Sequence, residues 1–286
     1  MKHQPTPEQI IARARQEVAP RRAHEADRSW SRASRWLWPA LALAAVALFL
    51  AAPAPLPHKL LLAMGGVCGL RRAHSYFAGG IQLPIEARMI GIYGGFSVTF
   101  IILLALRRLG ERRLGSRLVI GILTLFFASM AFDGINSTLT DLGLPHIYQS
   151  TNVTRLVTGL FSGIAIAPFL VWLLGVVATP RRESPTRAVV RSPWELLLPL
   201  VLNAGFAGLV MSERAGFYYP IALLSVGGVV ATMTIAALLA VLSISGMEGW
   251  ITRPQQVIAP ASVALLIAFA VLAATAAARW SVSSGL

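Results

Sequence analysis

The sequence predicts an all-α, polytopic membrane protein with about seven transmembrane helices, and two observations carry this prediction. Hydrophobic residues make up 56% of the 286 positions and charged residues only 13%, with a mean hydropathy of +0.66. Several apolar runs also approach the ~20 residues that a helix needs to cross a bilayer. A soluble domain of this length would instead show shorter, amphipathic helices. We therefore expect a multi-pass protein of the cell membrane.

The first expected span is the run "WLWPALALAAVALFLAA", residues 36–52, with Trp36 and Trp38 at its interfacial end. Further apolar runs predict six more spans, over residues 89–106, 118–135, 156–178, 194–211, 219–245 and 257–278. The run "LLLAMGGVCGL", residues 60–70, has only 11 residues, about half a crossing. We expect this run to form one short re-entrant or interfacial segment.

The basic residues divide unequally between the two sides of the predicted bundle. With a cytoplasmic N-terminus and seven spans, 18 of the 25 Lys and Arg residues lie on the cytoplasmic side, as the positive-inside rule predicts. The outer segments hold the other seven, which are Lys59, Arg71, Arg72, Arg88, Arg155, Arg214 and Arg279. A full crossing by residues 60–70 would move the loop "RRLGERRLGSR" outside, so the distribution argues against such a crossing.

The chain divides into four predicted parts. Residues 1–35 form a basic cytoplasmic tail, and residues 36–178 form a membrane domain with the first four spans. Residues 179–193 form a basic linker, and residues 194–286 form the C-terminal membrane helices with the last three spans. Unusual polar residues concentrate in the second part, which is therefore where a site is expected.

The net charge of +13 does not predict a nucleic-acid partner, because no DNA- or RNA-binding module accompanies it. The partner that this charge pattern predicts is the lipid bilayer. The single cysteine, Cys68, excludes an internal disulfide and a multi-cysteine metal site. The sequence also shows no P-loop, zinc-protease helix or nucleophile elbow. We expect no bound metal and no cofactor.

Six candidate site residues gather on the outer side of this topology: Glu86, Arg88, Tyr93, Asp133, Asn152 and Arg155. Ionisable groups at membrane depth are costly and are usually paired or functional. If the second, third and fourth spans are neighbours, Glu86 or Asp133 would pair with Arg88 or Arg155. The same outer region also contains His74, Asn136, Asp141 and His146.

Each of these features also has a plainer explanation. Ser150 or Thr151 in "QSTNVTR" is suited to cap the following helix. The patterns Gly91-x-x-x-Gly95 and Gly159-x-x-x-Gly163 are typical of close packing between membrane helices. The sequence leaves open whether the polar residues form a binding site or only a structural network.

The order of "VCG", "AHSYFAGGIQLPIEARMIGIYGGF", "FDG" and "QSTNVTRLVTG" resembles a family of bacterial and archaeal membrane proteins, domain of unknown function 2085. Typical members carry three cysteines and a histidine here, which implies metal or thiol chemistry for them. In this chain Gly69 follows Cys68, and Glu86 and Met89 replace the other two cysteines. The resemblance covers residues 64–175 and extends to Ser75, Arg88, Gly91, Tyr93, Asp133, Asn152, Arg155 and Gly159. It implies a shared scaffold without exchange between paired thiols.

Three classes of function remain. The first is a non-enzymatic carrier or accessory membrane subunit that recognises a small anion or lipid head group, because outer arginines occur without a nucleophile and base. The alternative is a membrane-embedded enzyme on a lipid-linked or phosphate-bearing substrate, with Glu86 or Asp133 as acid or base. A structural role beside a partner in a membrane complex would leave the polar residues to stabilise the fold.

Overall fold

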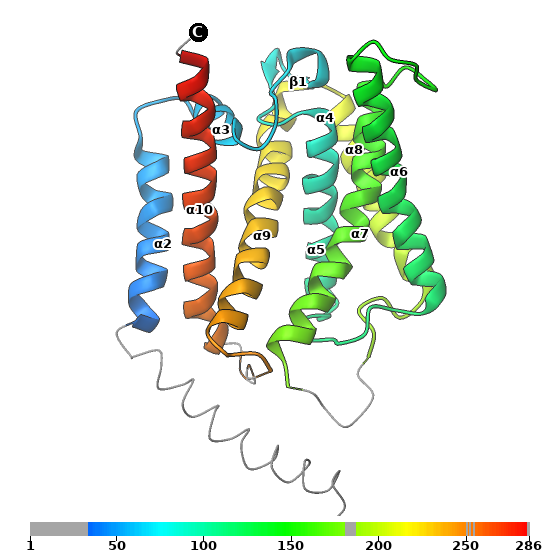
Figure 1. The fold of residues 1–286 in the computed structure, drawn as a ribbon. Coiled ribbons are helices and arrows are strands. Elements are labelled where there is room, and N and C mark those ends of the chain that lie inside the picture. The colour runs from blue at the N-terminus through cyan, green and yellow to red at the C-terminus, as the bar shows by residue number, and fades with distance from the viewer. Residues whose placement is uncertain (1–33, 181–186, 250, 252, 254, 285–286) are drawn as a thin grey trace, which may run out of the picture.

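The computed structural model describes residues 34–180, 187–249, 251, 253 and 255–284. Figure 1 shows these residues as long helices that stand side by side in one bundle, with loops at its two ends. Within these residues, six helical segments are long and apolar enough to cross a membrane. A pair bent by 120°, Arg35–Ala51 with Leu56–Met64, passes the same test jointly and raises the number to as many as seven. The predicted all-α, polytopic class is confirmed.

The first helix of the described chain, α2 (Ser34–Ala51), lies beside α10 (Gln255–Ser284) and is shorter than it (Figure 1). Helix α3 (Leu56–Met64) then crosses the upper end in that view. The short run expected at residues 60–70 therefore contributes the end of α3 and a turn across the bundle end. The expected tail at residues 1–33 and the linker centre at 181–186 lie outside the described residues.

We name the two ends of the bundle by their loops. The cap end holds the loops over residues 52–86, 142–151 and 212–217. The basic end holds the loops over residues 106–116, 187–192 and 245–254, apart from the undescribed positions. The seven basic residues that the sequence assigns to the outer side all lie in or next to the cap-end loops.

The cap end is built from short elements. The helical turn η1 (Arg72–His74) precedes a hairpin of β1 (Phe77–Ala78) and β2 (Ile81–Gln82). The strands pair antiparallel, and Gly79 and Gly80 turn between them with φ of 58° and 80°, which glycine adopts without strain. The amide of Gly79 donates to the carbonyl of Glu213 over 2.8 Å and thereby joins the hairpin to the loop before α9.

The second span is an interrupted helix at the centre of the bundle. It begins with α4 (Ala87–Met89), continues through a π-helical turn η2 (Ile90–Gly94) and ends with α5 (Gly95–Ala105). A Cβ added at Gly91 or Gly159 would overlap the backbone of the facing helix, so both glycines serve close helix packing.

The remaining helices complete the bundle. They are α6 (Arg117–Asp141), α7 (Asn152–Ala178), η3 (Pro193–Leu196) with α8 (Leu197–Met211), and η4 (Ala215–Phe217) with α9 (Tyr218–Ile244). Helix α6 continues past the predicted end at residue 135, and α7 begins before residue 156. Beyond its apolar run, the hydroxyls of Thr138 and Thr140 donate to carbonyls four residues earlier, over 2.9 Å each, so these polar side chains are satisfied within α6 itself.

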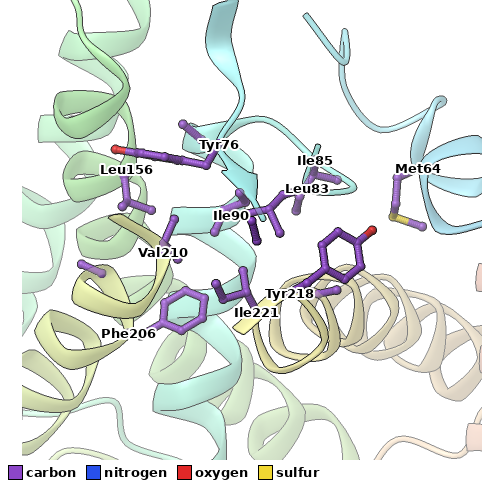
Figure 2. Packing of buried hydrophobic residues seen from close by; sticks show 14 of the residues in the cluster. Met64, Tyr76, Leu83, Ile85, Ile90, Leu156, Phe206, Val210, Tyr218 and Ile221 are labelled. Atoms are coloured by element: carbon purple, nitrogen blue, oxygen red, sulfur yellow. The ribbon is translucent and has the colours of Figure 1, made fainter. Parts of the chain in front are cut away.

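Beneath the cap lies a core of buried side chains, shown in Figure 2. Ile85 comes from the cap-end loop just before the interrupted helix, Ile90 from its π-helical turn, Phe206 from α8 and Ile221 from α9. Leu83, Ile85 and Ile90 are fully buried. This packing fixes the cap-end loop to the helices and so holds the neighbouring polar residues in place.

Candidate functional site

The start of α7 determines where two of the candidate residues lie. The hydroxyl of Thr151 accepts from the amide of Thr154 over 3.2 Å, and the Thr154 hydroxyl accepts from the amide of Thr151 over 2.9 Å. This capping box starts the helix at Asn152 and places Arg155 in its first turn. Of the two predicted caps, Thr151 is the one the structure uses.

The first centre of the site is the pair Arg88–Asp133, between α4 and α6. Arg88 Nη2 lies 2.6 Å from Asp133 Oδ2 and also donates to the Asp133 backbone carbonyl over 3.2 Å. The other carboxylate oxygen, Oδ1, accepts from Tyr148 Oη at 2.7 Å and Ser150 Oγ at 3.1 Å. Thr158 Oγ1 lies 3.3 Å from Oδ2. Asp133 is 0% exposed, so both oxygens of a fully buried carboxylate are occupied by donors.

The second centre is the carboxylate of Asp141, the last residue of α6. Arg71 Nη1 lies 2.8 Å from its Oδ2, while His74 Nε2 and Arg155 Nη2 lie 3.6 and 3.9 Å from its Oδ1. These three groups come from the cap-end loop and from α7. One carboxylate therefore lies within 4 Å of two guanidiniums and an imidazole.

Arg155 is buried, with 7% of its surface exposed, and its closer partners are neutral. Its Nε and Nη2 donate to Ser137 Oγ over 3.2 and 3.0 Å, and its Nη1 donates to Asn152 Oδ1 over 3.3 Å. A buried charge requires compensation, and the nearest carboxylate within the described residues is that of Asp141. The Arg155 guanidinium is thus oriented by neutral groups toward an anion at the Asp141 position.

Two amide side chains attach the loops to the helices around these centres. Asn136 Nδ2 donates to the Tyr148 carbonyl over 2.7 Å, and Asn136 Oδ1 accepts from the amide of Ile147 over 2.9 Å. Asn152 Nδ2 donates to the carbonyl of Ala73 over 3.2 Å. Asn136 orients the loop that carries Tyr148, and Asn152 holds the turn that carries His74.

Glu86 pairs with a residue that the sequence did not suggest. Its Oε1 accepts from the amide of Arg71 over 2.8 Å and lies 3.6 Å from Arg71 Nε. The predicted pairing with Arg88 or Arg155 is realised by Asp133 with Arg88, and not by Glu86. Glu86 has extended backbone angles and precedes the helix as its N-cap, so it does not share a helical face with the residues that follow.

Tyr93 lies apart from the two centres. It packs against the buried core that contains Ile90 and Ile221, and its backbone meets Gly228 of α9. Among the described residues, no hydrogen bond joins Tyr93 to the other five candidates. The structure therefore brings together Arg88, Asp133, Asn152 and Arg155, attaches Glu86 through Arg71, and leaves Tyr93 on the far side of the interrupted helix.

Cys68 lies next to Glu86, so two positions that carry cysteine in the resembling family are neighbours here. Burial raises the pKa of the Cys68 thiol, although the Glu86 backbone amide that bonds it acts in the opposite direction. A raised pKa keeps the thiol protonated and weakly nucleophilic at neutral pH. No group of three or more metal-ligating side chains occurs within the described part of the chain.

Two groups outside the spans have shifted pKa values that describe the site electrostatically. Burial lowers the pKa of His74, and the charges of Arg155 and Arg71 lower it further, against an opposing effect of Asp141. Burial raises the pKa of Tyr148, and its hydrogen bond to Asp133 raises it further. At neutral pH His74 is therefore uncharged, and Tyr148 is a hydrogen-bond donor.

The sequence did not single out the neutral donors of the two centres as site residues. The sequence patterns predicted no site role for Tyr148, Ser137 or Thr158, and they suggested Ser150 only as a helix cap. The sequence does contain one indication that Ser137 belongs to the site. Asp133, Ser137 and Asp141 follow each other at steps of four and so lie on one face of α6. The contribution of Tyr148 depends on how its loop folds back.

Comparison with known proteins shows that the segment that carries this site is similar to a known family. Residues 68–169 match the model of the family described as "Predicted membrane protein (DUF2085)", so the resemblance expected from the motifs is confirmed. The matched segment contains both centres of the site. No curated protein and no solved structure was found to match the chain.

Proposed function

We propose that this protein, an integral membrane protein whose residues 68–169 match the DUF2085 family, is a non-enzymatic carrier or accessory subunit that binds a small oxyanion. The anion would be bound by Arg71, His74 and Arg155 at the cap end. A phosphate or carboxylate group, free in solution or in a lipid head group, has the required chemistry.

The observation that carries the proposal is the convergence of these three side chains on Asp141. Arg71 Nη1, His74 Nε2 and Arg155 Nη2 lie 2.8, 3.6 and 3.9 Å from its carboxylate oxygens. A guanidinium pairs equally well with carboxylates and phosphates, because its planar donors match both. The Asp141 carboxylate occupies the place in which an external oxyanion would be held.

The position of Asp141 favours its displacement by a ligand. It ends α6, and Gly143 follows with a φ of 68° in an exposed stretch of loop. Its own side chain is 29% exposed. A change confined to this helix end would release the carboxylate, while Asp133 stays anchored to Arg88 about two turns below.

The carboxylates of the cap end support a binding role over catalysis. Both oxygens of Asp133 accept hydrogen bonds, and Glu86 accepts from the Arg71 amide. A general acid or base needs a carboxyl that reaches a substrate and exchanges a proton with it. Neither Asp133 nor Glu86 is presented in this way, which favours the non-enzymatic alternative.

The test is oxyanion binding by the purified, detergent-solubilised protein. Arg71→Gln is the first variant, because the Arg71 side chain is 55% exposed and its replacement leaves no cavity in the core. Arg155→Gln is the second variant. Arg72→Gln is the control, because the Cζ atom of Arg72 lies over the Phe77 ring, 5.1 Å from its centroid, and outside the site. Isothermal titration with inorganic phosphate and with a short-chain phosphatidic acid separates free anion from lipid head group.

We expect Arg71→Gln and Arg155→Gln each to weaken binding of at least one probe roughly tenfold, as the loss of one charge-assisted contact implies. Arg72→Gln should bind as the parent does. Equal affinity of the parent and both site variants, or no binding by the parent, would refute the proposal.

A further inference from the structure

The loops of the basic end form a second structured surface, which the cap-end proposal does not involve. The amides of Val189 and Val190 donate to the carbonyls of Arg113 and Leu114 over 2.8 and 3.0 Å. These bonds join the loop before α6 to the segment before α8. The starts of the two helices are therefore held together, although α7 packs between the helices themselves.

Close packing fixes this junction. A Cβ added at Gly115 would come within 3.0 Å of the Val190 carbonyl and would also overlap the Val119 side chain. Val119 and Val189 are fully buried in the same apolar cluster, and Val190 is 3% exposed. The side chains that flank the junction thus project from a rigid base.

Two arginines of the loop before α6 are used internally. Arg108 Nη2 lies 2.8 Å from Glu195 Oε1, and Arg108 is 4% exposed. Arg112 Nη1 donates to the carbonyl of Val176 over 2.8 Å, near the end of α7. These contacts stabilise the fold and tie both guanidiniums to neighbouring segments of the protein.

Three other arginines at the junction make no such internal contacts with described residues. Arg113, Arg117 and Arg191 are exposed, and no hydrogen bond or ion pair joins their guanidiniums to another described residue. Glu195 cannot neutralise them, because its Oε1 pairs with Arg108 and its Oε2 accepts from the backbone amide of Arg191 over 3.0 Å. Within the described residues, the junction therefore carries positive charge that no ion pair compensates, on a fixed scaffold.

Exposed apolar side chains adjoin this charge on the side of the helices. Leu118, next to Arg117, is 63% exposed, and Trp194, three residues after Arg191, is 77% exposed. Leu197, in the first turn of α8, is 51% exposed. Tryptophan at a helix end is typical of the membrane interface, where the aliphatic chains of lipids begin below the head groups.

We propose that Arg113, Arg117 and Arg191 form a site for the phosphate group of an anionic phospholipid, with Trp194, Leu118 and Leu197 against its glycerol and acyl region. Arginine binds phosphate through two parallel N–H donors, and basic surfaces between membrane helices are suited to anionic head groups. A zwitterionic lipid carries a compensating positive charge and is bound more weakly. The site requires both the free guanidiniums and the adjacent apolar side chains.

The experiment measures lipid binding to the full chain in detergent by native mass spectrometry. Phosphatidylglycerol and phosphatidylcholine of equal chain length are titrated onto the parent, the double variant Arg117→Gln/Arg191→Gln and the control Arg253→Gln. Arg253 is exposed at the same end and carries the same charge, but it lies in the loop between α9 and α10. Competition with inorganic phosphate distinguishes a lipid site from one that takes the free anion.

We expect the double variant to lose roughly thirtyfold in phosphatidylglycerol affinity, from about one kilocalorie per mole for each basic residue at the surface. Phosphatidylcholine binding should change little, and Arg253→Gln should match the parent. Excess phosphate should not displace the lipid, because the apolar contacts remain. An equal loss in Arg253→Gln, an unchanged double variant, or complete displacement by phosphate would overturn the proposal.

Discussion

Arg88 Nη2 lies 2.6 Å from Oδ2 of Asp133, and this pair joins the start of the interrupted central helix to α6. Asp133 is fully buried, and the Arg88 side chain is 21% exposed. Because burial of two charges is compensated only while both are present, each residue depends on the other.

The first prediction concerns this pair. Asp133→Asn should lower the free energy of unfolding by about 3–5 kcal/mol, because it leaves a mostly buried guanidinium without its counter-charge. Arg88→Met combined with Asp133→Leu should cost less than the sum of the single changes. Chemical unfolding in mixed micelles measures all of these variants, and additive losses would show that the pair does not act as a unit.

The second prediction concerns Tyr148, whose hydroxyl donates to Asp133 Oδ1 over 2.7 Å. Tyr148→Phe removes this donor and leaves the ring, so we expect a loss of about 2 kcal/mol in unfolding free energy, typical of a hydrogen bond to a charged group. Tyr219→Phe is the matched control, because Tyr219 is 56% exposed. Equal stability of both variants would show that the Asp133 carboxylate does not need the Tyr148 donor.

The third prediction concerns the crossing of the central helix with α7. Gly91→Ala would push a methyl group into the backbone of α7, and we expect a loss of about 1–3 kcal/mol from overpacking. Gly205→Ala in α8 meets no atom within 4 Å, so it should leave the stability unchanged or raise it slightly. Comparison of thermal midpoints in one detergent measures both variants, and similar losses would contradict the close contact.

The fourth prediction concerns pH. The pKa of His74 is lowered in the folded protein by burial and by Arg155 and Arg71, while Asp141 and Glu86 act in the opposite direction. The unfolded chain therefore binds a proton at higher pH, near the ordinary value of 6.5, than the folded chain does. The contribution of neutral His74 to the free energy of unfolding is therefore complete above pH 6.5, and it is lost as the pH falls through the folded pKa.

His74→Gln should consequently reduce the acid sensitivity of the unfolding midpoint below pH 6.5 and change little at pH 8. His146→Gln is the control, because His146 lies in the exposed loop after α6 and bonds only within that loop. The same acid sensitivity in parent and His74→Gln would exclude this contribution.

The sequence predicted the fold class correctly, and the structure brings four of the six candidate residues together for identifiable reasons. Helices α6 and α7 are consecutive and pack against each other, so Asp133, Asn152 and Arg155 lie near the same end of the bundle. Glu86 and Tyr93 could not be placed in this way. Glu86 precedes the helix in an extended conformation, and the π-helical turn at residues 90–94 changes the helical period that relates Glu86 to Tyr93.

The second centre required the three-dimensional structure. Arg71 and His74 belong to a loop without helical or strand periodicity, and their distance to Asp141 depends on how that loop folds over α6 and α7. The predicted end of α6 at residue 135 was also wrong, because polar residues continue the helix to Asp141. A prediction that stops at the last apolar residue omits the part of the helix that carries the proposed anion site.

The most direct test of this account is the phosphate affinity of Asp141→Asn. The substitution keeps the shape of the side chain and removes the carboxylate that lies between Arg71, His74 and Arg155. If Asp141 occupies the anion site, the variant should bind inorganic phosphate or phosphatidic acid roughly tenfold more tightly than the parent, and the ligand should raise its thermal midpoint more. A folded Asp141→Asn protein that binds both probes no better than the parent would contradict the central claim.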